Sequence, residues 1–145
     1  MVADGIADIL LVEDNSADIK LTQKAFEKGK IKNHLSIARD GEDALEFLRR
    51  EGEYEDAPRP DLILLDLFMP KMGGQEFLEI VKADDAFKAI PVVILTTSDA
   101  DQDIVKGYTS QASAFITKPV DFHNFIEVIH KIEDFYLAIV KLPPN

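Results

Sequence analysis

The sequence contains no cysteine. Without a thiol there is no disulfide framework, no zinc site built on cysteine and no cysteine nucleophile. Histidine is also scarce, and His34, His123 and His130 are too dispersed along the chain to predict a cluster of metal ligands. Any metal chemistry in this protein must therefore rest on oxygen ligands.

Basic residues are the minority among the charged side chains. Sixteen Lys and Arg residues face 27 Asp and Glu residues, which leaves a formal net charge of -11 at pH 7. A surface of this sign repels phosphate backbones and anionic lipid headgroups. We therefore expect no binding to nucleic acid and no docking on a membrane surface.

Targeting and membrane segments are also missing from the sequence. Residues 1–8 carry Asp4 and Asp8 and have no basic start followed by an apolar run, which excludes a secretory signal. No apolar stretch approaches the ~20 residues that a membrane helix needs. With 145 residues, 46% of them apolar, the composition predicts one soluble domain with its own core. We expect a cytoplasmic protein.

The apolar residues that are present fall into two alternating patterns. Short continuous runs predict strands that are covered on both faces, as in a parallel sheet. These runs lie at residues 9–12, 35–38, 62–65, 92–95 and 114–116. Longer segments with helical spacing follow each run, the first of them after a predicted Ser16 cap. These segments lie at residues 17–28, 41–50, 74–82, 99–110 and 121 to about 140.

Alternation of strand and helix, repeated five times, predicts the fold class. It favours right-handed crossovers and a doubly wound α/β architecture, in which helices cover both faces of an open five-stranded parallel sheet. The acidic stretch at residues 51–60 is the longest predicted loop, and its composition is typical of a solvated connector.

Chemically active side chains follow the ends of four predicted strands. In an open parallel sheet these ends share one edge, where ligands bind at the switch in strand order. The same number of residues separates Asp14 from Asp66 and Asp66 from Lys118, as two strand–helix units between each pair would give. The residues are Glu13 and Asp14 after the first strand, Asp66 after the third, Thr96 and Thr97 after the fourth, and Lys118 and Pro119 after the fifth.

Three carboxylates at one place repel each other unless a cation neutralises them. Oxygen-only ligands favour a hard cation, and magnesium binds one or two carboxylates while keeping positions for water and a substrate phosphate. Lys118 and a threonine hydroxyl would then hold phosphoryl oxygens, and an aspartate at this place could act as the nucleophile. Taken singly, each residue has an ordinary structural explanation: Asp14 as a helix cap, Asp66 as a turn residue and Lys118 as a surface lysine. The whole set together predicts a phosphoryl-acceptor site.

Four segments stand out as motifs: Leu11-Val12-Glu13-Asp14-Asn15, Leu65-Asp66-Leu67-Phe68-Met69-Pro70, Pro91-Val92-Val93-Ile94-Leu95-Thr96 and Ala114-Phe115-Ile116-Thr117-Lys118-Pro119. As a set they resemble a known family, the receiver domains of two-component response regulators. The resemblance covers about residues 8–131 and implies a flavodoxin-like fold with strand order 2-1-3-4-5.

The resemblance implies a role for each site residue. Asp66 would accept a phosphoryl group from a phosphohistidine on a sensor histidine kinase. Mg²⁺, with Mn²⁺ or Ca²⁺ as possible substitutes, would be held by Glu13, Asp14, Asp66 and the backbone carbonyl of Phe68. Thr96, with Thr97 as its alternative, and Lys118 would contact the phosphoryl oxygens. Phe115 would be the aromatic switch, and the Lys118–Pro119 peptide would be cis.

Two positions depart from the commonest pattern of that family. Phe68 is apolar where many relatives carry a polar side chain, so the sequence does not fix the lifetime of the phosphoryl group. Phe115 lacks a tyrosine hydroxyl, so its switching would work through packing alone.

The C-terminal segment is richer in apolar residues than one helical face requires. We expect a receiver domain over residues 1–131 and an extension over residues 132–145 that forms a homodimer, because surplus apolar surface usually marks an interaction site. A tail folded back on its own domain is the alternative. The expected interface residues are Phe135, Tyr136, Leu137, Ile139, Val140 and Leu142.

The tail and the loop before Asp61 also resemble the stand-alone regulators paired with phytochromes in bacteria and cyanobacteria. This resemblance makes a phytochrome a possible kinase partner.

Four functional classes share parts of this pattern. The first is a phosphoacceptor that signals through protein contacts and is not an enzyme beyond its own phosphorylation and dephosphorylation. A flavodoxin-like FMN carrier is disfavoured, because Glu13 and Asp14 would repel the cofactor phosphate. A phosphohydrolase would need a second Asp where Phe68 stands. A receiver-like scaffold without phosphorylation is disfavoured by the intact set of acids, Thr96 and Lys118.

Overall fold

Five parallel strands form one sheet in the order β2-β1-β3-β4-β5. The computed structural model describes residues 6–29, 32–66, 72–96, 114–117 and 122–134. The strands are β1 (Ala7–Val12), β2 (Asn33–Ala38), β3 (Leu62–Asp66), β4 (Val92–Thr96) and β5 (Ala114–Thr117). The observed order confirms the expected doubly wound topology, and each predicted strand is present with slightly wider bounds.

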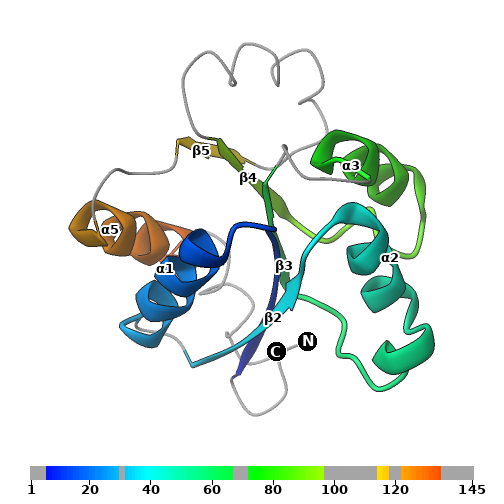
Figure 1. Cartoon of the computed structure of the whole chain (residues 1–145), viewed down its shortest axis with the longest axis horizontal. Coiled ribbons are helices and arrows are strands. Elements are labelled where there is room, and N and C mark those ends of the chain that lie inside the picture. The colour runs from blue at the N-terminus through cyan, green and yellow to red at the C-terminus, as the bar shows by residue number, and fades with distance from the viewer. Residues whose placement is uncertain (1–5, 30–31, 67–71, 97–113, 118–121, 135–145) are drawn as a thin grey trace, which may run out of the picture.

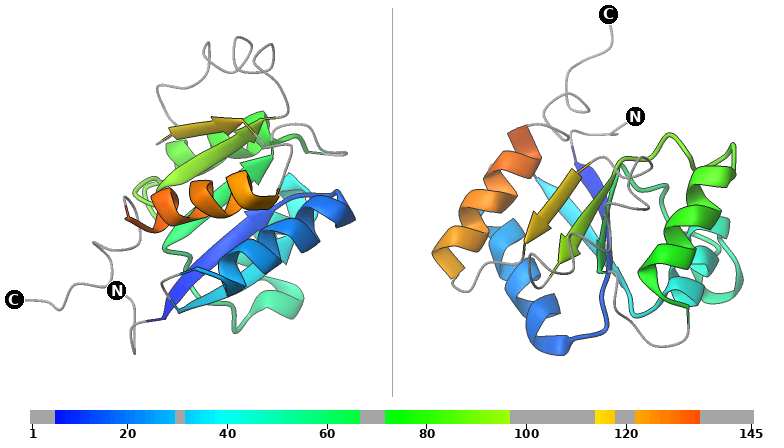
Figure 2. Two further views of the ribbon diagram at one scale, coloured as in Figure 1. Left: turned by 90° about the vertical axis from the view of Figure 1, so that its left-hand side faces the viewer. Right: turned by 90° about the horizontal axis from the view of Figure 1, so that it is seen from above.

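Helices cover both faces of this sheet (Figures 1 and 2). On one face lie α1 (Ser16–Glu27) and α5 (Phe122–Ile132), and on the other lie α2 (Gly41–Arg49) and α3 (Gly74–Ala83). A short 3₁₀ helix, η2 (Gly52–Tyr54), lies within the segment whose composition predicts a plain connector. The helix expected over residues 99–110 lies outside the described residues.

Two hydrophobic clusters fill the spaces between the sheet and its helices. Leu10 and Val12 of β1 pack toward Phe47 and Phe77, whereas Ile9 and Leu11 belong to the opposite cluster. Every residue of β3 is buried, since neighbouring strands and helices surround it. This two-sided burial explains why the strands appear in the sequence as continuous apolar runs instead of alternating ones.

The start of α1 differs from the sequence prediction in one residue. Asn15, and not Ser16, is the N-cap: its backbone is extended, and its side-chain oxygen accepts a hydrogen bond from the Asp18 amide at 3.0 Å. Ser16 is instead the first helical residue. Both residue types are good N-caps, so the backbone conformation of the turn after β1 decided between them.

The C-terminal end of α5 leads to the segment of the expected extension. The α-helix ends at Ile132, and residues 135–145, which include all six expected interface residues, lie outside the described part. Within the described helices, none has the length and hydropathy to cross a membrane.

Candidate functional site

Three carboxylates meet at the carboxyl-terminal edge of the sheet. Glu13 and Asp14 directly follow β1, and Asp66 is the last residue of β3. Because β1 and β3 are adjacent and parallel, with Val12 paired to Leu65, Glu13 and Asp66 reach this edge at equivalent positions. One carboxylate oxygen from each of Glu13, Asp14 and Asp66 lies within 4.8 Å of the others. The structure thus brings together the three acids that the sequence predicts for one site.

The turn between β1 and α1 holds two of these acids in place. The Glu13 amide donates to the carbonyl of Ala38 at 2.9 Å, which extends the pairing of β1 with β2 by one residue. The Glu13 carboxylate accepts from the Asn15 amide at 3.4 Å, and Asn15 in turn caps α1. The conformation of this turn therefore follows from the helix cap and the sheet together.

Burial differs among the three acids. Glu13 and Asp66 are 1% and 5% exposed, whereas Asp14 is accessible to solvent. Like charges this close are costly where water is largely excluded. A divalent cation that enters the site from solvent, on the side of Asp14, would relieve the repulsion. Carboxylate oxygens are the ligands that hard cations such as Mg²⁺ prefer. The donor set therefore fits a hard divalent metal.

Thr96 and Phe115 are placed by their backbones. Thr96 ends β4, one residue beyond the partner of Asp66, and it pairs with Thr117 of β5. Phe115 pairs with Ile94 in the middle of the last two strands. Thr96 therefore reaches the same edge as Asp66, as expected. Phe68, Thr97, Lys118 and Pro119 lie outside the described residues.

A contact that the sequence did not reveal holds the chain beyond Asp66. The Gly41 amide, at the start of α2, donates to the carbonyl of Met72 at 3.0 Å. A Cβ atom at position 41 would lie 2.7 Å from the Met72 Cγ atom and 2.9 Å from its carbonyl oxygen. Only glycine permits this approach. The Asp40-Gly41 pair before an amphipathic helix was the available signal, but it predicts a cap and not a tertiary contact.

Comparison with known proteins agrees with this geometry. The family model of the response regulator receiver domain matches residues 9–130. The chain therefore belongs to the receiver domains of response regulators, signalling proteins that accept phosphoryl groups.

Its similarity is strong to regulators linked with phytochromes. Response regulator Rcp1 of Synechocystis sp. is 43% identical over 135 residues, which cover 93% of this chain and 92% of Rcp1. The crystal structure of the phosphorylated cyanobacterial phytochrome response regulator RcpA has a TM-score of 0.83 and 43% identity, covering 95% of this chain and 99% of RcpA. The Mn(2+)-bound form of Rcp1 has a TM-score of 0.81 and 42% identity, with the same coverage.

Proposed function

We propose that Asp66 is the residue that accepts the phosphoryl group, and that a sensor histidine kinase is the donor. The observation that carries the proposal is the convergence of Glu13, Asp14 and Asp66 within 4.8 Å at the edge where the sheet of this family binds its ligand. In the transfer, a carboxylate oxygen of Asp66 forms the new P–O bond. The P–N bond to the donor histidine breaks, and the histidine nitrogen keeps the electron pair.

Asp66 is favoured over its two neighbours by its position. It ends β3, the central strand of the sheet, and, unlike Asp14, it is buried. Glu13 has one carboxylate oxygen turned toward the Asn15 amide, and Asp14 lies at the solvent side. Glu13 and Asp14 are thus suited to hold a metal beside Asp66.

The metal in this proposal is Mg²⁺. Glu13, Asp14, Asp66 and the backbone carbonyl of Phe68 would hold it, and when bound it supplies positive charge against the carboxylates and the incoming phosphoryl oxygens. The existence of a Mn(2+)-bound form of the relative Rcp1 supports a divalent cation at this place. Thr96 and Lys118 would contact the phosphoryl oxygens, and Phe115 would respond to the movement of Thr96 as the switch residue.

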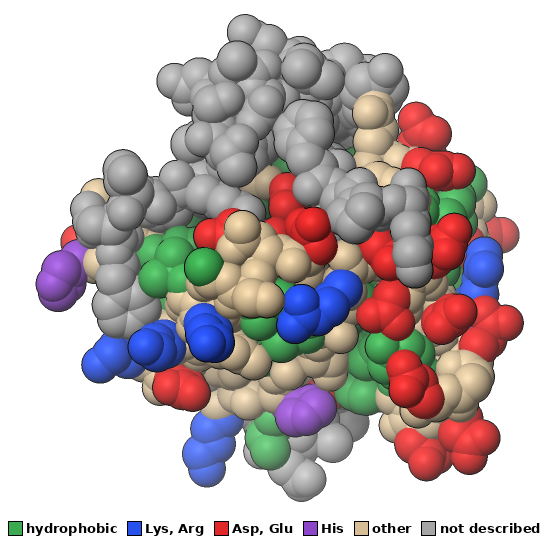
Figure 3. Space-filling view, in the orientation of Figure 1, with side chains coloured by type: hydrophobic (Ala, Val, Ile, Leu, Met, Phe, Trp, Pro, Cys, Tyr) green, Lys and Arg blue, Asp and Glu red, His purple; other side chains and the backbone are tan. Residues whose placement is uncertain are grey.

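The partner is expected to approach along α1. Lys20, Lys24 and Lys28 are exposed at intervals of about one helical turn, and α1 begins at the acceptor edge. Figure 3 shows basic side chains over the α1 side of this face and acidic ones over the α2 and α3 side. Such a segregated surface steers an acidic partner toward the site. The likeness of this chain to RcpA, a cyanobacterial phytochrome response regulator, supports a phytochrome as the kinase. We further propose that the protein acts in the cytoplasm.

The central experiment is incubation of the full chain with Mg²⁺ and acetyl phosphate, followed by intact-mass measurement. We expect the mass gain of one phosphoryl group in the wild type and none in Asp66→Asn. Glu46→Gln, which removes an exposed acid on α2, is the matched control and should gain the group as the wild type does. An equal gain in Asp66→Asn would contradict the assignment.

A homodimer through the C-terminal segment is part of the same proposal. Light scattering on a chain that ends at Lys131 should show a monomer where the full chain shows a dimer. A truncated chain that stays dimeric would place the interface outside residues 132–145, and a full chain that is monomeric would favour the tail folded back on its own domain.

A further inference from the structure

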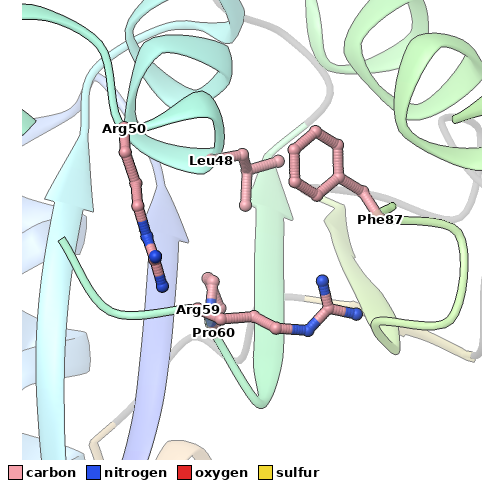
Figure 4. Close-up of a pocket in the computed structure, with 5 residues that line it drawn as sticks. All are labelled: Leu48, Arg50, Arg59, Pro60 and Phe87. Carbon is pink, nitrogen blue, oxygen red and sulfur yellow. The ribbon is translucent and has the colours of Figure 1, made fainter. Parts of the chain in front are cut away.

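A cavity of about 310 Å³ lies at the edge of the sheet opposite the three carboxylates. Two of its residues come from α2 and its C-terminal end, two from the segment that enters β3, and one from the turn between α3 and β4 (Figure 4). We name it the arginine pocket. Its lining residues are Leu48, Arg50, Arg59, Pro60 and Phe87.

Two arginine residues line this cavity in a chain whose net charge is -11. Arg59 donates a short hydrogen bond from its Nη1 atom to the carbonyl of Ala86, which is a neutral acceptor. Neither arginine forms an ion pair with a carboxylate of the described residues. The acids of the neighbouring turn have other partners, since Asp84 accepts from the Ala86 amide and Asp85 pairs with Lys88 at 2.8 Å. The pocket therefore presents two arginines that form no ion pair with any carboxylate of the described residues.

The remaining surface of the pocket is apolar. Leu48 and Pro60 are buried, Phe87 is partly buried, and the side chains of Leu48 and Phe87 are turned toward one another in Figure 4. An apolar floor with cationic side chains around it suits a ligand that joins an apolar group to an anion. The volume is at the lower end of the range for ligand sites, roughly 300 Å³, so it accommodates one large side chain and not a dinucleotide.

Arg50 has a backbone conformation that favours glycine. Its φ and ψ are 55° and 46°, in the left-handed region directly after α2, and its amide donates to the carbonyl of Phe47 at 3.2 Å. A side chain at such a position costs about 1 kcal/mol relative to glycine. A role for the guanidinium in binding would account for an arginine where glycine is the less strained residue.

We propose that the arginine pocket binds a peptide segment of a partner protein in which a large apolar side chain is flanked by carboxylates. The apolar side chain packs on the surface that Leu48 and Phe87 form together, and the carboxylates meet Arg50 and Arg59. Charge complementarity selects this occupant, because both guanidinium groups can form charge-assisted hydrogen bonds to carboxylates. Since β3 separates Pro60 from Asp66, a peptide here leaves the acceptor edge open.

The test is a ¹H–¹⁵N NMR titration of the full chain with the peptide Ac-Asp-Phe-Asp-NH₂. We expect shifts at the amides of Leu48, Arg50, Arg59, Asp61 and Phe87, and weaker binding of both Ac-Asn-Phe-Asn-NH₂ and Ac-Asp-Ala-Asp-NH₂. The titration needs neither metal nor phosphoryl donor, so its failure would leave the proposed function at Asp66 unaffected. No shifts at these amides, or equal binding of the neutral peptide, would overturn the proposal.

Substitutions separate the pocket from general surface charge. Arg50→Gln and Arg59→Gln should each weaken binding of Ac-Asp-Phe-Asp-NH₂ about threefold to fivefold, as the loss of an ion pair between exposed side chains does. Arg49→Gln is the matched control, because Arg49 is an exposed neighbour of Arg50 that does not line the pocket, and its affinity should equal that of the wild type. The Arg50 side chain forms no hydrogen bond with the described residues. Arg50→Gln therefore tests the pocket without disturbing the fold. A loss with Arg49→Gln equal to that with Arg50→Gln would overturn the proposal.

Discussion

Substitution of Asp66 by Asn should make the metal-free protein more stable while removing its response to magnesium. The change keeps the shape of the side chain but deletes one of three negative charges. Carboxylate oxygens of Glu13, Asp14 and Asp66 lie within 4.8 Å of one another, and both Glu13 and Asp66 are buried. Asp66 therefore contributes two of the three repulsive pairs in this cluster.

The size of the effect follows from Coulomb's law. At 4.8 Å a pair of unit charges repels by about 0.9 kcal/mol in bulk water and by about 3.5 kcal/mol at an effective dielectric constant of 20. Hydrogen bonds that the carboxylates accept offset part of this repulsion, so we expect a net gain of about 1–3 kcal/mol in the free energy of unfolding. In a domain of this length, that corresponds to a rise of roughly 3–10 °C in Tm.

Magnesium should make the wild type more stable than Asp66→Asn, which reverses their order of stability in the absence of metal. A ligand at a hundred times its Kd adds about 2.7 kcal/mol to the stability of the protein that binds it. The wild type should gain this stabilisation, whereas Asp66→Asn, which would lack one of the proposed ligands, should gain little.

Thermal and urea unfolding, each in EDTA and in MgCl₂, measure both effects. Glu46→Gln controls for the removal of a negative charge elsewhere and should respond to Mg²⁺ as the wild type does. An Asp66→Asn protein that is less stable than the wild type in EDTA would refute the reasoning from charge repulsion. An equal Mg²⁺-induced rise in Tm would show that Asp66 is not part of the metal site.

Three further predictions concern the surrounding structure. Gly41→Ala should lower the free energy of unfolding by about 1–3 kcal/mol in urea titrations, because its Cβ atom would lie 2.7 Å from Met72 Cγ. Adding Met72→Ala to the Gly41→Ala chain should restore part of the loss. Fully additive losses from the two substitutions would contradict the contact. Tyr54→Phe should cost about 1 kcal/mol, since the Tyr54 hydroxyl donates to Asp43 at 2.7 Å; an unchanged urea midpoint would contradict that value. Burial, and then the neighbouring Asp61 carboxylate, raises the pKa of Asp8 above its ordinary value of 3.8. The free energy of unfolding therefore falls as the pH rises through the folded-state pKa and Asp8 ionises. Asp8→Asn should therefore raise Tm at pH 7, with a gain that shrinks toward pH 4; a gain independent of pH would contradict the argument.

The prediction of the fold from sequence succeeded where periodicity reflects burial. The residues of β3 and residues 92–95 of β4 are buried on both faces of the sheet, so their sequence runs are continuously apolar. The acids at the ends of β1 and β3 were placed together by topology alone, because parallel strands end at one edge.

Predictions that depend on a single turn or on a distant contact were less complete. Whether Asn15 or Ser16 caps α1 depends on which residue has extended backbone, and local composition does not decide that. The approach of Gly41 to Met72 joins the start of α2 to a segment that is distant in the sequence, so no pattern near either residue reports it.

The sequence by itself determined the class of fold and the edge of the sheet at which Glu13, Asp14 and Asp66 meet, since both follow from burial patterns and strand ends. The tertiary structure alone decided how close those acids lie, which of them is open to solvent, and that Arg50 and Arg59 share one pocket with Leu48 and Phe87. The physical reason is that distances and shared cavities arise from the packing of segments that are remote in the chain. Local propensity carries no information about that packing.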